Sequence, residues 1–275
     1  MLVDLHSHST CSDGLLSPVD LVERAAQRGV DMLALTDHDE LSGLVAAREA
    51  AAHWGLRLID GVEISVLWED TTLHIVGLCV DPAHVALVDG LAEIRSGRER
   101  RAQRMAESLA AAGITGSLEG ARQYAKNPEL LSRAHFARHL VAAGHARDIN
   151  AVFRSYLTPG KPGYVPHQWA ALQDAVGWIN GSGGVAVIAH PGRYPLNQQQ
   201  CERLLGEFIS LGGAAIEVVT GSHAPDEFAT WARYAQRFGL RASAGSDFHG
   251  PGEGYRDLGN VPVLPAGCDP VWTGF

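Results

Sequence analysis

The chain begins with an apolar run that leads into two histidines, in the stretch Val3-Asp4-Leu5-His6-Ser7-His8-Ser9-Thr10-Cys11-Ser12-Asp13-Gly14. The run favours a first β-strand, in which side chains alternate between two faces, so that His6 and His8 point the same way. Neutral imidazole is a common metal ligand, and a strand fixes its direction. Asp13-Gly14 then predicts a turn that places a carboxylate just beyond the strand. The stretch therefore predicts a metal site, provided that further ligands follow in the chain.

The composition is that of a globular protein with a hydrophobic core: of 275 residues, 46% are hydrophobic and 19% charged. No apolar run approaches the ~20 residues that cross a bilayer, and Met1 leads into the first strand without a basic region or cleavage site. We therefore expect a cytoplasmic protein with no membrane partner. The four cysteines lack C-x-x-C spacing, so neither a disulfide framework nor a zinc ribbon is indicated.

The net charge is −9, but charge is unevenly distributed along the chain. Residues 95–166 contain twelve Lys or Arg against five Asp or Glu, a local balance of +7, so that the remainder carries −16. The negative total argues against a protein that coats long nucleic acid. A basic segment within an acidic chain favours bound cations and a small anionic substrate, although Arg98-Glu99-Arg100-Arg101 alone is also typical of a solvated helix.

Strand-like and helix-like segments alternate along most of the chain, which predicts a parallel sheet or barrel. Ser17-Pro18 predicts the start of the first helix, as a capping residue followed by proline. The expected strands cover about residues 3–8, 32–36, 58–64, 73–78, 184–190, 214–219 and 241–249. The helices expected after the first cover about residues 42–53, 168–180, 199–211 and 226–238.

The alternation is interrupted between residues 82 and 166. This segment is rich in Ala, Arg, Leu and Glu, so that we expect several helices and no strand, and it ends in a stiff loop, Thr158-Pro159-Gly160-Lys161-Pro162-Gly163-Tyr164-Val165-Pro166. The predicted division is therefore a barrel from residues 1–81 and 167–275, with an inserted helical domain at 82–166 that recognises the substrate.

Almost every predicted strand ends in histidine or an acidic residue. In an alternating α/β barrel the active site forms at the carboxyl ends of the strands, so these side chains should meet there. Chance does not readily place such residues after so many apolar strands, and a metal centre is the better explanation. The candidate ligands are His6, His8, Asp13, His38, Glu63, His74, His190, Asp247 and His249.

The same motifs resemble those of the PHP family, the polymerase and histidinol phosphatase metallo-phosphoesterases. They are His6-x-His8 with Asp13, Thr36-Asp37-His38, Gly61-x-Glu63, His74, Ala189-His190-Pro191 and Gly245-Ser246-Asp247-x-His249. The chain looks most like small stand-alone bacterial members with a helical insertion, which act on nucleoside 3′,5′-bisphosphates and in some cases on short RNA from its 5′ end. The resemblance implies a distorted (β/α)₇ TIM-like barrel and up to three metal ions.

The resemblance also implies how the ligands divide. His6, His8, Glu63 and Asp247 would hold the first metal and are the expected catalytic residues; Glu63, His74 and His190 would hold the second; Asp13, His38 and His249 would hold the third. A mixed imidazole and carboxylate set suits Mn²⁺, Fe²⁺ or Zn²⁺ better than Mg²⁺. We expect two or three divalent ions, Mn²⁺ first, with a hydroxide shared between two metals as the nucleophile on phosphorus.

The substrate-binding residues are harder to predict. Arg193 follows His190-Pro191-Gly192 and is placed to bind a phosphate, and Arg133, His135 and Lys161 of the insertion are candidates for a second phosphate, although the last three could equally lie on ordinary surface. Asp37 and Asp39 could each orient an imidazole or cap the following helix. His223 could reach the site as an acid, but a solvated loop histidine is the simpler expectation.

The leading functional hypothesis is a metal-dependent phosphatase that removes the 3′-phosphate of a nucleoside 3′,5′-bisphosphate. A 5′→3′ exoribonuclease acting on short 5′-phosphorylated RNA would use the same chemistry. Aminohydrolase barrels also use His-x-His, but they commonly keep a metal-bridging lysine at the end of a strand. That function is less favoured here, because Lys126 and Lys161, the only lysines, both fall in the insertion. A non-catalytic, metal-stabilised scaffold is also less favoured, because the ligand set is whole.

Overall fold

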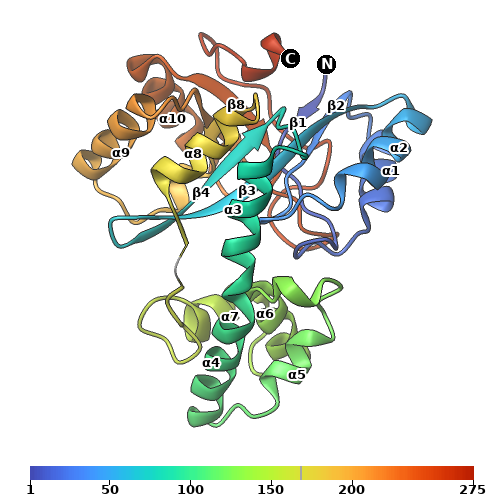
Figure 1. Ribbon diagram of the computed structural model, residues 1–275, viewed down its shortest axis with the longest axis vertical. Helices are drawn as coiled ribbons and strands as arrows, with labels where there is room; N and C mark the ends of the chain where they lie inside the picture. Colours follow the sequence, from blue (N-terminus) through green and yellow to red (C-terminus); the bar gives the residue numbers. More distant parts are fainter. Residues whose placement is uncertain (168) are drawn as a thin grey trace.

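In the computed structural model, which describes residues 1–167 and 169–275, seven strands follow one another around a sheet that nearly closes into a barrel (Figure 1). Their order is β1-β2-β3-β4-β6-β7-β8, and β5 pairs with the end of β3. The strands are β1 (Val3–Asp4), β2 (Met32–Leu35), β3 (Arg57–Trp68), β4 (Thr71–Leu78), β5 (Ala170–Ala171), β6 (Val185–Ile188), β7 (Ala215–Thr220) and β8 (Arg241–Gly245).

The two ends of the sheet meet through backbone hydrogen bonds. The Leu5 N–H donates to the Ala244 carbonyl at 2.9 Å, and the Asp247 N–H donates to the His6 carbonyl at 2.9 Å. The residues that follow β1 and β8 therefore join the edges that an open sheet would expose. The predicted distorted (β/α)₇ barrel is confirmed.

One strand runs against the others. β4 is antiparallel to β3 and to β6, whereas the other neighbouring pairs along the sheet are parallel. The sequence predicts the reason, because Trp68-Glu69-Asp70-Thr71 leaves no room for a crossover helix and can only form a hairpin. Glu69 takes a left-handed conformation in this turn, with φ 48°. The reversal brings the first half of β4 to the edge of the barrel where the parallel strands end.

The helices of the barrel lie outside the sheet (Figure 1). The first begins as predicted, with the Ser17 hydroxyl accepting from the Asp20 N–H and Pro18 as its first residue. The helices are α1 (Pro18–Gln27), α2 (Leu44–Trp54), α3 (Val85–Ser96), α8 (Leu172–Gly181), α9 (Gln198–Ser210) and α10 (Pro225–Phe238). The predicted start of α8, Gln168, lies outside the described residues. None of the described helices is both long and apolar enough to span a membrane.

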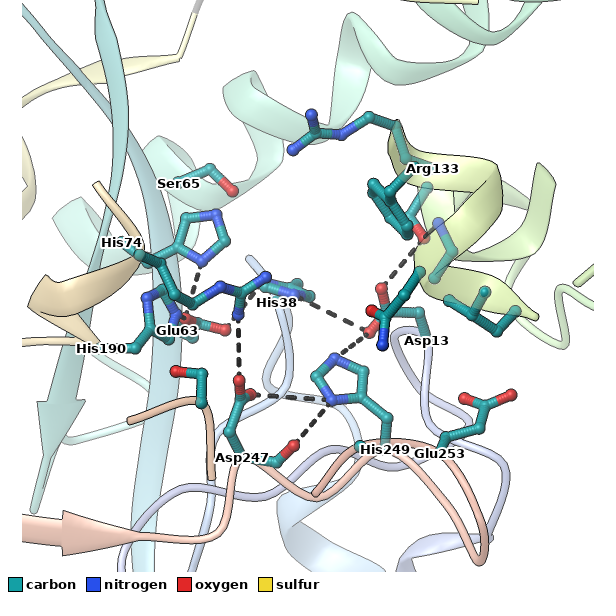
Figure 2. A pocket seen from close by; sticks show the side chains of 18 of the residues that line it. Asp13, His38, Glu63, Ser65, His74, Arg133, His190, Asp247, His249 and Glu253 are labelled. Carbon is teal, nitrogen blue, oxygen red and sulfur yellow. Dashed lines mark hydrogen bonds and ion pairs between the residues drawn. The ribbon is translucent and has the colours of Figure 1, made fainter. Parts of the chain in front are cut away.

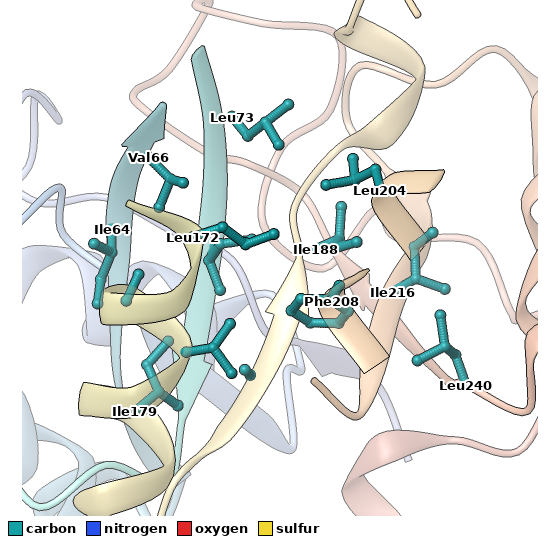
Figure 3. Packing of buried hydrophobic residues seen from close by; sticks show 14 of the residues in the cluster. Ile64, Val66, Leu73, Leu172, Ile179, Ile188, Leu204, Phe208, Ile216 and Leu240 are labelled. Carbon is teal, nitrogen blue, oxygen red and sulfur yellow. The ribbon is translucent and has the colours of Figure 1, made fainter. Parts of the chain in front are cut away.

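The main core fills the space between the sheet and the outer helices. Figure 3 shows Ile64, Val66 and Ile188 of the strands packed with Leu172 of α8 and Phe208 of α9, all of them buried. Burying each such side chain contributes about 1.5–3 kcal/mol relative to leaving it exposed. This packing makes the barrel a rigid support for the side chains at its rim.

The segment between β4 and β5 is helical, as expected, and most of it forms a separate lobe (Figure 1). The lobe has its own core, which includes Met105, Leu109, Phe136 and Leu140. However, α3 packs in the barrel core rather than in the core of the lobe. The predicted domain boundary at residue 82 stays a prediction. The helices of the lobe are α4 (Arg98–Ala111), α5 (Ser117–Arg122), α6 (Arg133–Ala142) and α7 (Ile149–Val152), with a 3-10 turn at Pro128–Leu130 and a π-helix at Phe153–Leu157.

Candidate metal centre

The two histidines of the first motif lie beyond β1, which ends at Asp4. The predicted strand was too long, because the partner here is the irregular segment after β8: the His8 N–H donates to the Phe248 carbonyl at 2.9 Å. Both imidazoles are nevertheless fully buried, and their ring centroids are 5.1 Å apart. The expected side-by-side placement of His6 and His8 is therefore observed.

Glu63, in the middle of β3, lies at the centre of the surrounding imidazoles (Figure 2). Its Oε1 atom lies 2.8 Å from His74 Nδ1 and 2.9 Å from His190 Nε2. Its Oε2 atom faces three further nitrogens, which are His38 Nδ1 at 3.0 Å, His6 Nε2 at 3.3 Å and His8 Nε2 at 3.3 Å. Burial would raise the pKa of Glu63, but the charges of the imidazoles lower it well below its usual value. The carboxylate is therefore anionic and has both oxygens available as ligands.

Two further carboxylates complete the polar wall. Asp247 Oδ1 lies 3.5 Å from His6 Nε2 and 3.4 Å from His8 Nε2. Asp13 Oδ1 lies 3.4 Å from His249 Nε2 and 3.8 Å from His38 Nε2. The nine predicted ligands therefore converge on one region at the carboxyl ends of the parallel strands.

Several donor atoms in this region have no hydrogen-bond partner among the described residues. They include His6 Nε2, His8 Nε2, Asp13 Oδ1 and Glu63 Oε2, all of which are buried. An unsatisfied buried polar group costs about 1–3 kcal/mol, and here four such atoms belong to overlapping groups of possible ligands. Divalent cations would satisfy them, and the mixed nitrogen and oxygen set fits Mn²⁺, Fe²⁺ or Zn²⁺.

The ligand atoms fall into overlapping groups, in each of which the atoms lie within 4.8 Å of one another. The overlap is typical of a centre that holds more than one ion, because shared ligands bridge neighbouring metals. The groups are His8, Asp13, His38 and His249; His6, Glu63 and His190; His6, His8 and Asp247; and His38, Glu63 and His74. The chain thus carries a buried site suited to several metals.

Two of these residues have a backbone conformation that L-residues rarely adopt. His190 has φ 28° and Asp247 has φ 55°, both on the left-handed side. Such conformations cost of the order of 1–3 kcal/mol each and persist where surrounding contacts impose them. Here they turn the chain at the ends of β6 and β8, so that both side chains point into the centre.

The sequence analysis overlooked Glu217, which lies within β7. Its Oε1 atom is 2.7 Å from His6 Nδ1, and its Oε2 atom accepts from the His190 N–H at 2.6 Å. A carboxylate behind a ligating histidine fixes the direction of the ring and raises its basicity. The available signal was an acidic residue inside the otherwise apolar segment Ala214–Val219.

Replacing Glu217 by glutamine is expected to weaken metal binding by about 10–100-fold. Glutamine has one acceptor oxygen where glutamate has two, so either the His6 ring or the His190 N–H loses its partner. Titration of the metal-free protein with Mn²⁺ measures the change. The control is Glu207→Gln on α9, where the carboxylate accepts from Trp68 Nε1 and touches none of the imidazoles. Equal affinity in the two variants would contradict the proposed role of Glu217.

In the described part of the chain, the two aspartates that flank His38 neither orient an imidazole nor cap the following helix, which were the two roles predicted from the sequence. Asp37 accepts from the Ser9 N–H at 2.7 Å and from the hydroxyls of Ser9 and Ser12, so it holds the turn that leads to Asp13. Asp39 accepts from the backbone N–H of Ser65 at 2.8 Å and from its hydroxyl. Among the described contacts, neither aspartate bonds an imidazole or caps α2. Asp37 therefore supports the turn before Asp13, and Asp39 ties the residue after His38 to β3.

His223 is buried, contrary to the expectation of a solvated loop histidine. Its Nδ1 atom donates to the Val218 carbonyl at 3.2 Å, and its Nε2 atom accepts from the Gly192 N–H at 2.9 Å. Burial lowers the pKa of His223, which agrees with a neutral ring. The residue therefore anchors the loop that carries Arg193.

A cavity of about 520 Å³ opens onto the metal centre. Arg193 and Arg133, two of the candidate phosphate ligands, both line it. Arg193 donates to Asp247 Oδ2 at 3.0 Å, and Figure 2 shows Arg133 projecting from α6 on the side of the cavity opposite Glu63 and His190. The cavity therefore has a metal-binding wall from the barrel and a basic wall from the helical lobe.

The other two predicted phosphate ligands do not line the cavity. His135 is buried, and its Nδ1 atom accepts from the Ser132 N–H at the start of α6. Lys161 is exposed in the turn after the π-helix. Arg98 and Arg101 line the cavity instead, and only 3% and 4% of their surfaces are exposed. They belong to the basic run that the sequence analysis also considered as a solvated helix face.

Comparison with known proteins identifies relatives along the whole chain. The chain is 56% identical to a 3′,5′-nucleoside bisphosphate phosphatase of Chromobacterium violaceum over 270 residues, which cover 98% of this chain and 95% of that protein. It is 46% identical to a 5′-3′ exoribonuclease of Salmonella typhimurium over 274 residues, covering 99% of this chain and 93% of that protein.

The fold is shared with a solved structure from Chromobacterium violaceum, described as an amidohydrolase with bound sulfate and no metal. The TM-score is 0.97 at 54% sequence identity, over 100% of this chain and 95% of that one. In addition, the model of the PHP domain matches residues 4–220, which include seven of the nine converging ligands. With its near-closed barrel and buried histidine and carboxylate groups, the chain belongs to the PHP domain family of phosphoesterases.

Proposed function

We propose that the chain is a metal-dependent phosphatase that removes the 3′-phosphate from nucleoside 3′,5′-bisphosphates, such as adenosine 3′,5′-bisphosphate. The observation that carries this proposal is the cavity with two unlike walls, one of imidazoles and carboxylates and the other of arginines. A substrate with two phosphates can meet both walls at once. The name of the relative from Chromobacterium violaceum supports the same substrate.

The basic wall lacks acidic partners for two of its arginines. Arg98 pairs with Asp39, but Arg101 and Arg133 form no ion pair among the described residues and donate only to backbone carbonyls. Burial, together with the charges of Arg133 and Arg98, lowers the pKa of Arg101 to about 9. An anion between these guanidinium groups would offset their mutual repulsion, and Arg can bind phosphate through two parallel hydrogen bonds.

Aromatic side chains line the same cavity and offer surfaces for a base. The Arg133 guanidinium lies 5.7 Å from the Phe153 ring centroid, and Trp169 and Tyr255 also contribute to the lining. Bases stack on aromatic rings and on guanidinium planes. A cavity of about 520 Å³ falls within the usual range for small-molecule sites, roughly 300–1,000 Å³. A mononucleoside bisphosphate therefore suits the site in size and chemistry.

In the proposed mechanism, bound divalent ions, preferably Mn²⁺, would polarise the phosphoryl oxygens. They would also lower the pKa of bound water, so that a nucleophile is available at neutral pH. His6, His8, Glu63 and Asp247 would hold the first ion, Glu63, His74 and His190 the second, and Asp13, His38 and His249 the third. Glu217 keeps the His6 ring and the His190 backbone in place. Arg193, held by Asp247, would bind the phosphoryl group under attack and fix its orientation.

The deciding experiment compares phosphate release from adenosine 3′,5′-bisphosphate, from AMP and from a short 5′-phosphorylated RNA, each with Mn²⁺ and after chelation. Rapid, Mn²⁺-dependent release from the bisphosphate, with little from AMP, is expected. The second candidate is the 5′→3′ exoribonuclease, supported by the relative from Salmonella typhimurium. It would be preferred if mononucleotides were released from the RNA faster than phosphate from the bisphosphate. A metal-loaded protein that hydrolysed none of these would act on another phosphoester or have the scaffold role alone.

Replacing Arg133 by alanine is expected to lower kcat/KM for the bisphosphate by roughly 10–100-fold, since a hydrogen bond to a charged group contributes about 1.5–3 kcal/mol. Hydrolysis of a nucleoside 3′-monophosphate should change little, because that substrate has no second phosphate to bind. The control is Arg122→Ala on α5, an exposed arginine that pairs with Glu99 outside the cavity. An unchanged ratio of the two activities would exclude Arg133 as the ligand of the second phosphate.

A further inference from the structure

The helical lobe touches the barrel at the loops that carry one group of proposed ligands. Apart from bonds to Glu93 of α3 and to Pro166, which flank this segment, the described side-chain hydrogen bonds and ion pairs from residues 95–165 to the rest of the chain end within residues 9–14, 37–40 and 246–254. We name these three segments the ligand loops. They carry Asp13, His38 and His249, which converge with His8 on one group of atoms.

The first contact is made directly to Asp13. The Ser132 hydroxyl donates to Asp13 Oδ2 at 3.0 Å, and Arg138 Nη2 donates to the Asp13 carbonyl at 2.6 Å. All three residues are buried, with 9%, 5% and 4% of the surface exposed for Ser132, Arg138 and Asp13. Asp13 Oδ1 is left facing His249 and His38. Helix α6 therefore sets both the position of this carboxylate and the oxygen that it presents (Figure 2).

The same arginine holds a second ligand loop. Arg138 Nε and Nη2 donate to the two carboxylate oxygens of Glu253 at 2.8 and 2.6 Å. Glu253 lies four residues after His249, on the loop that follows β8. Because a bidentate arginine–carboxylate pair fixes orientation as well as distance, Arg138 holds the loops of Asp13 and His249 at a set separation.

The third ligand loop is held where α3 meets the lobe. Arg95 Nη1, near the end of α3, donates to the Asp39 carbonyl at 2.7 Å, and Arg98, the first residue of α4, pairs with the Asp39 carboxylate. Asp39 adjoins His38 and has φ 51°, a conformation that needs such support. In addition, Asn127 donates to the Cys11 carbonyl at 3.2 Å, within the loop of Asp13.

Three of the ligands near Glu63, which are His6, His74 and His190, are held differently. Glu217 of β7 fixes the His6 ring and the His190 backbone, and the Tyr194 hydroxyl accepts from the His74 N–H at 2.9 Å while donating to the Ala189 carbonyl. All of these partners belong to the barrel. The contrast divides the centre into a part that the barrel builds alone and a part that needs the lobe.

We propose that the helical lobe assembles the cation site formed by His8, Asp13, His38 and His249, with Arg138 and Ser132 as its positioning residues. The proposal rests on the metal centre assigned above but not on any particular substrate. Ser132 is followed directly by Arg133, which lines the cavity, so one helix start positions both the Asp13 carboxylate and a phosphate-binding guanidinium. Binding of an anion at Arg133 and of a cation at this site should therefore favour each other.

The test is calorimetric titration of the metal-free full-length chain with Mn²⁺, for the wild type and Arg138→Met. The expected result is a 10–100-fold loss of affinity for one equivalent of Mn²⁺, with the remaining equivalents unchanged. Arg122→Met, in the same lobe but paired with Glu99 away from the ligand loops, should match the wild type. Anomalous scattering from Mn²⁺-loaded crystals should show that the weakened ion is the one beside Asp13.

Further variants separate positioning from folding. Glu253→Gln keeps the side chain's size while weakening its pair with Arg138, and Ser132→Thr keeps a hydroxyl for Asp13, so the first should weaken the same equivalent and the second should spare it. The proposal is overturned if folded Arg138→Met and Glu253→Gln bind every equivalent as the wild type does, or if all equivalents weaken together. Metal binding is measured without turnover, so failure of the phosphatase assay would not affect this result.

Discussion

Replacing Glu63 by glutamine is expected to lower kcat/KM by about 10²–10⁴-fold. Each oxygen of this carboxylate faces at least two imidazole nitrogens, and an amide would leave one of the two positions with a donor where a ligand is needed. Removing one partner of a buried charged pair costs about 3–5 kcal/mol, which corresponds to the stated range at about 1.4 kcal/mol per tenfold. Steady-state kinetics at saturating Mn²⁺ would measure the effect.

The matched control is Glu202→Gln on α9, where a partly exposed carboxylate pairs with Arg237 outside the cavity. This variant should retain wild-type kinetics. Metal content should fall in Glu63→Gln while the circular dichroism spectrum is kept, because the neighbours of β3 in the sheet are unaffected by the substitution. Activity within threefold of the wild type would show that Glu63 is not a ligand.

Removal of the metal ions is expected to abolish hydrolysis and to lower the melting temperature by about 10 °C. At a free metal concentration of 100 times Kd, two sites would together contribute roughly 5 kcal/mol to the free energy of unfolding. Each kcal/mol corresponds to about 2–4 °C in melting temperature for a chain of this size class. Protonation of His8 in the metal-free protein offsets part of this loss of stability. Burial lowers the pKa of His8, but its hydrogen bonds with Asp247 and Glu63 raise it to about 10, so that the protonated ring can pair with these carboxylates when no metal is bound. Thermal unfolding with EDTA, and again after adding Mn²⁺, measures the difference.

The same pair of measurements on Glu63→Gln provides the control, because a protein that has lost its bridging ligand should respond less to Mn²⁺. Full recovery of activity on adding Mn²⁺ distinguishes reversible metal loss from irreversible unfolding. A chelated protein that hydrolyses the bisphosphate at the original rate, with an unchanged melting temperature, would rule out metal dependence.

The barrel could be predicted from the sequence because its strands are apolar runs of regular spacing, and because His190 and Asp247 follow two of them directly. The length of the first strand could not, since nothing in Val3-Asp4-Leu5-His6 shows that its later partner is the irregular chain around Phe248. The spacing of His6 and His8 is enough to predict that they share a face. Whether their backbone pairs as a regular strand depends on a partner segment far along the chain.

Side chains that act through tertiary contacts were the hardest to predict. Glu217 is a single acidic residue in an apolar strand, and only the fold places it behind His6. Arg98 and Arg101 occupy a run whose charge pattern also fits a solvated helix, and their burial depends on packing against Trp169. His223 was misjudged for the same reason, because a loop in the sequence need not be a surface loop in space.

The joining of the two ends of the sheet has a consequence for how the protein reaches its native state. Glu63 and His74 are brought together by one hairpin and are only 11 residues apart, whereas His6 and Asp247 meet across almost the whole chain. Local contacts form quickly, while distant ones wait until the intervening chain has collapsed. The first metal site can therefore be complete only at the last stage of folding. A nascent chain cannot acquire the full centre until residue 249 has been synthesised and β8 has docked beside β1.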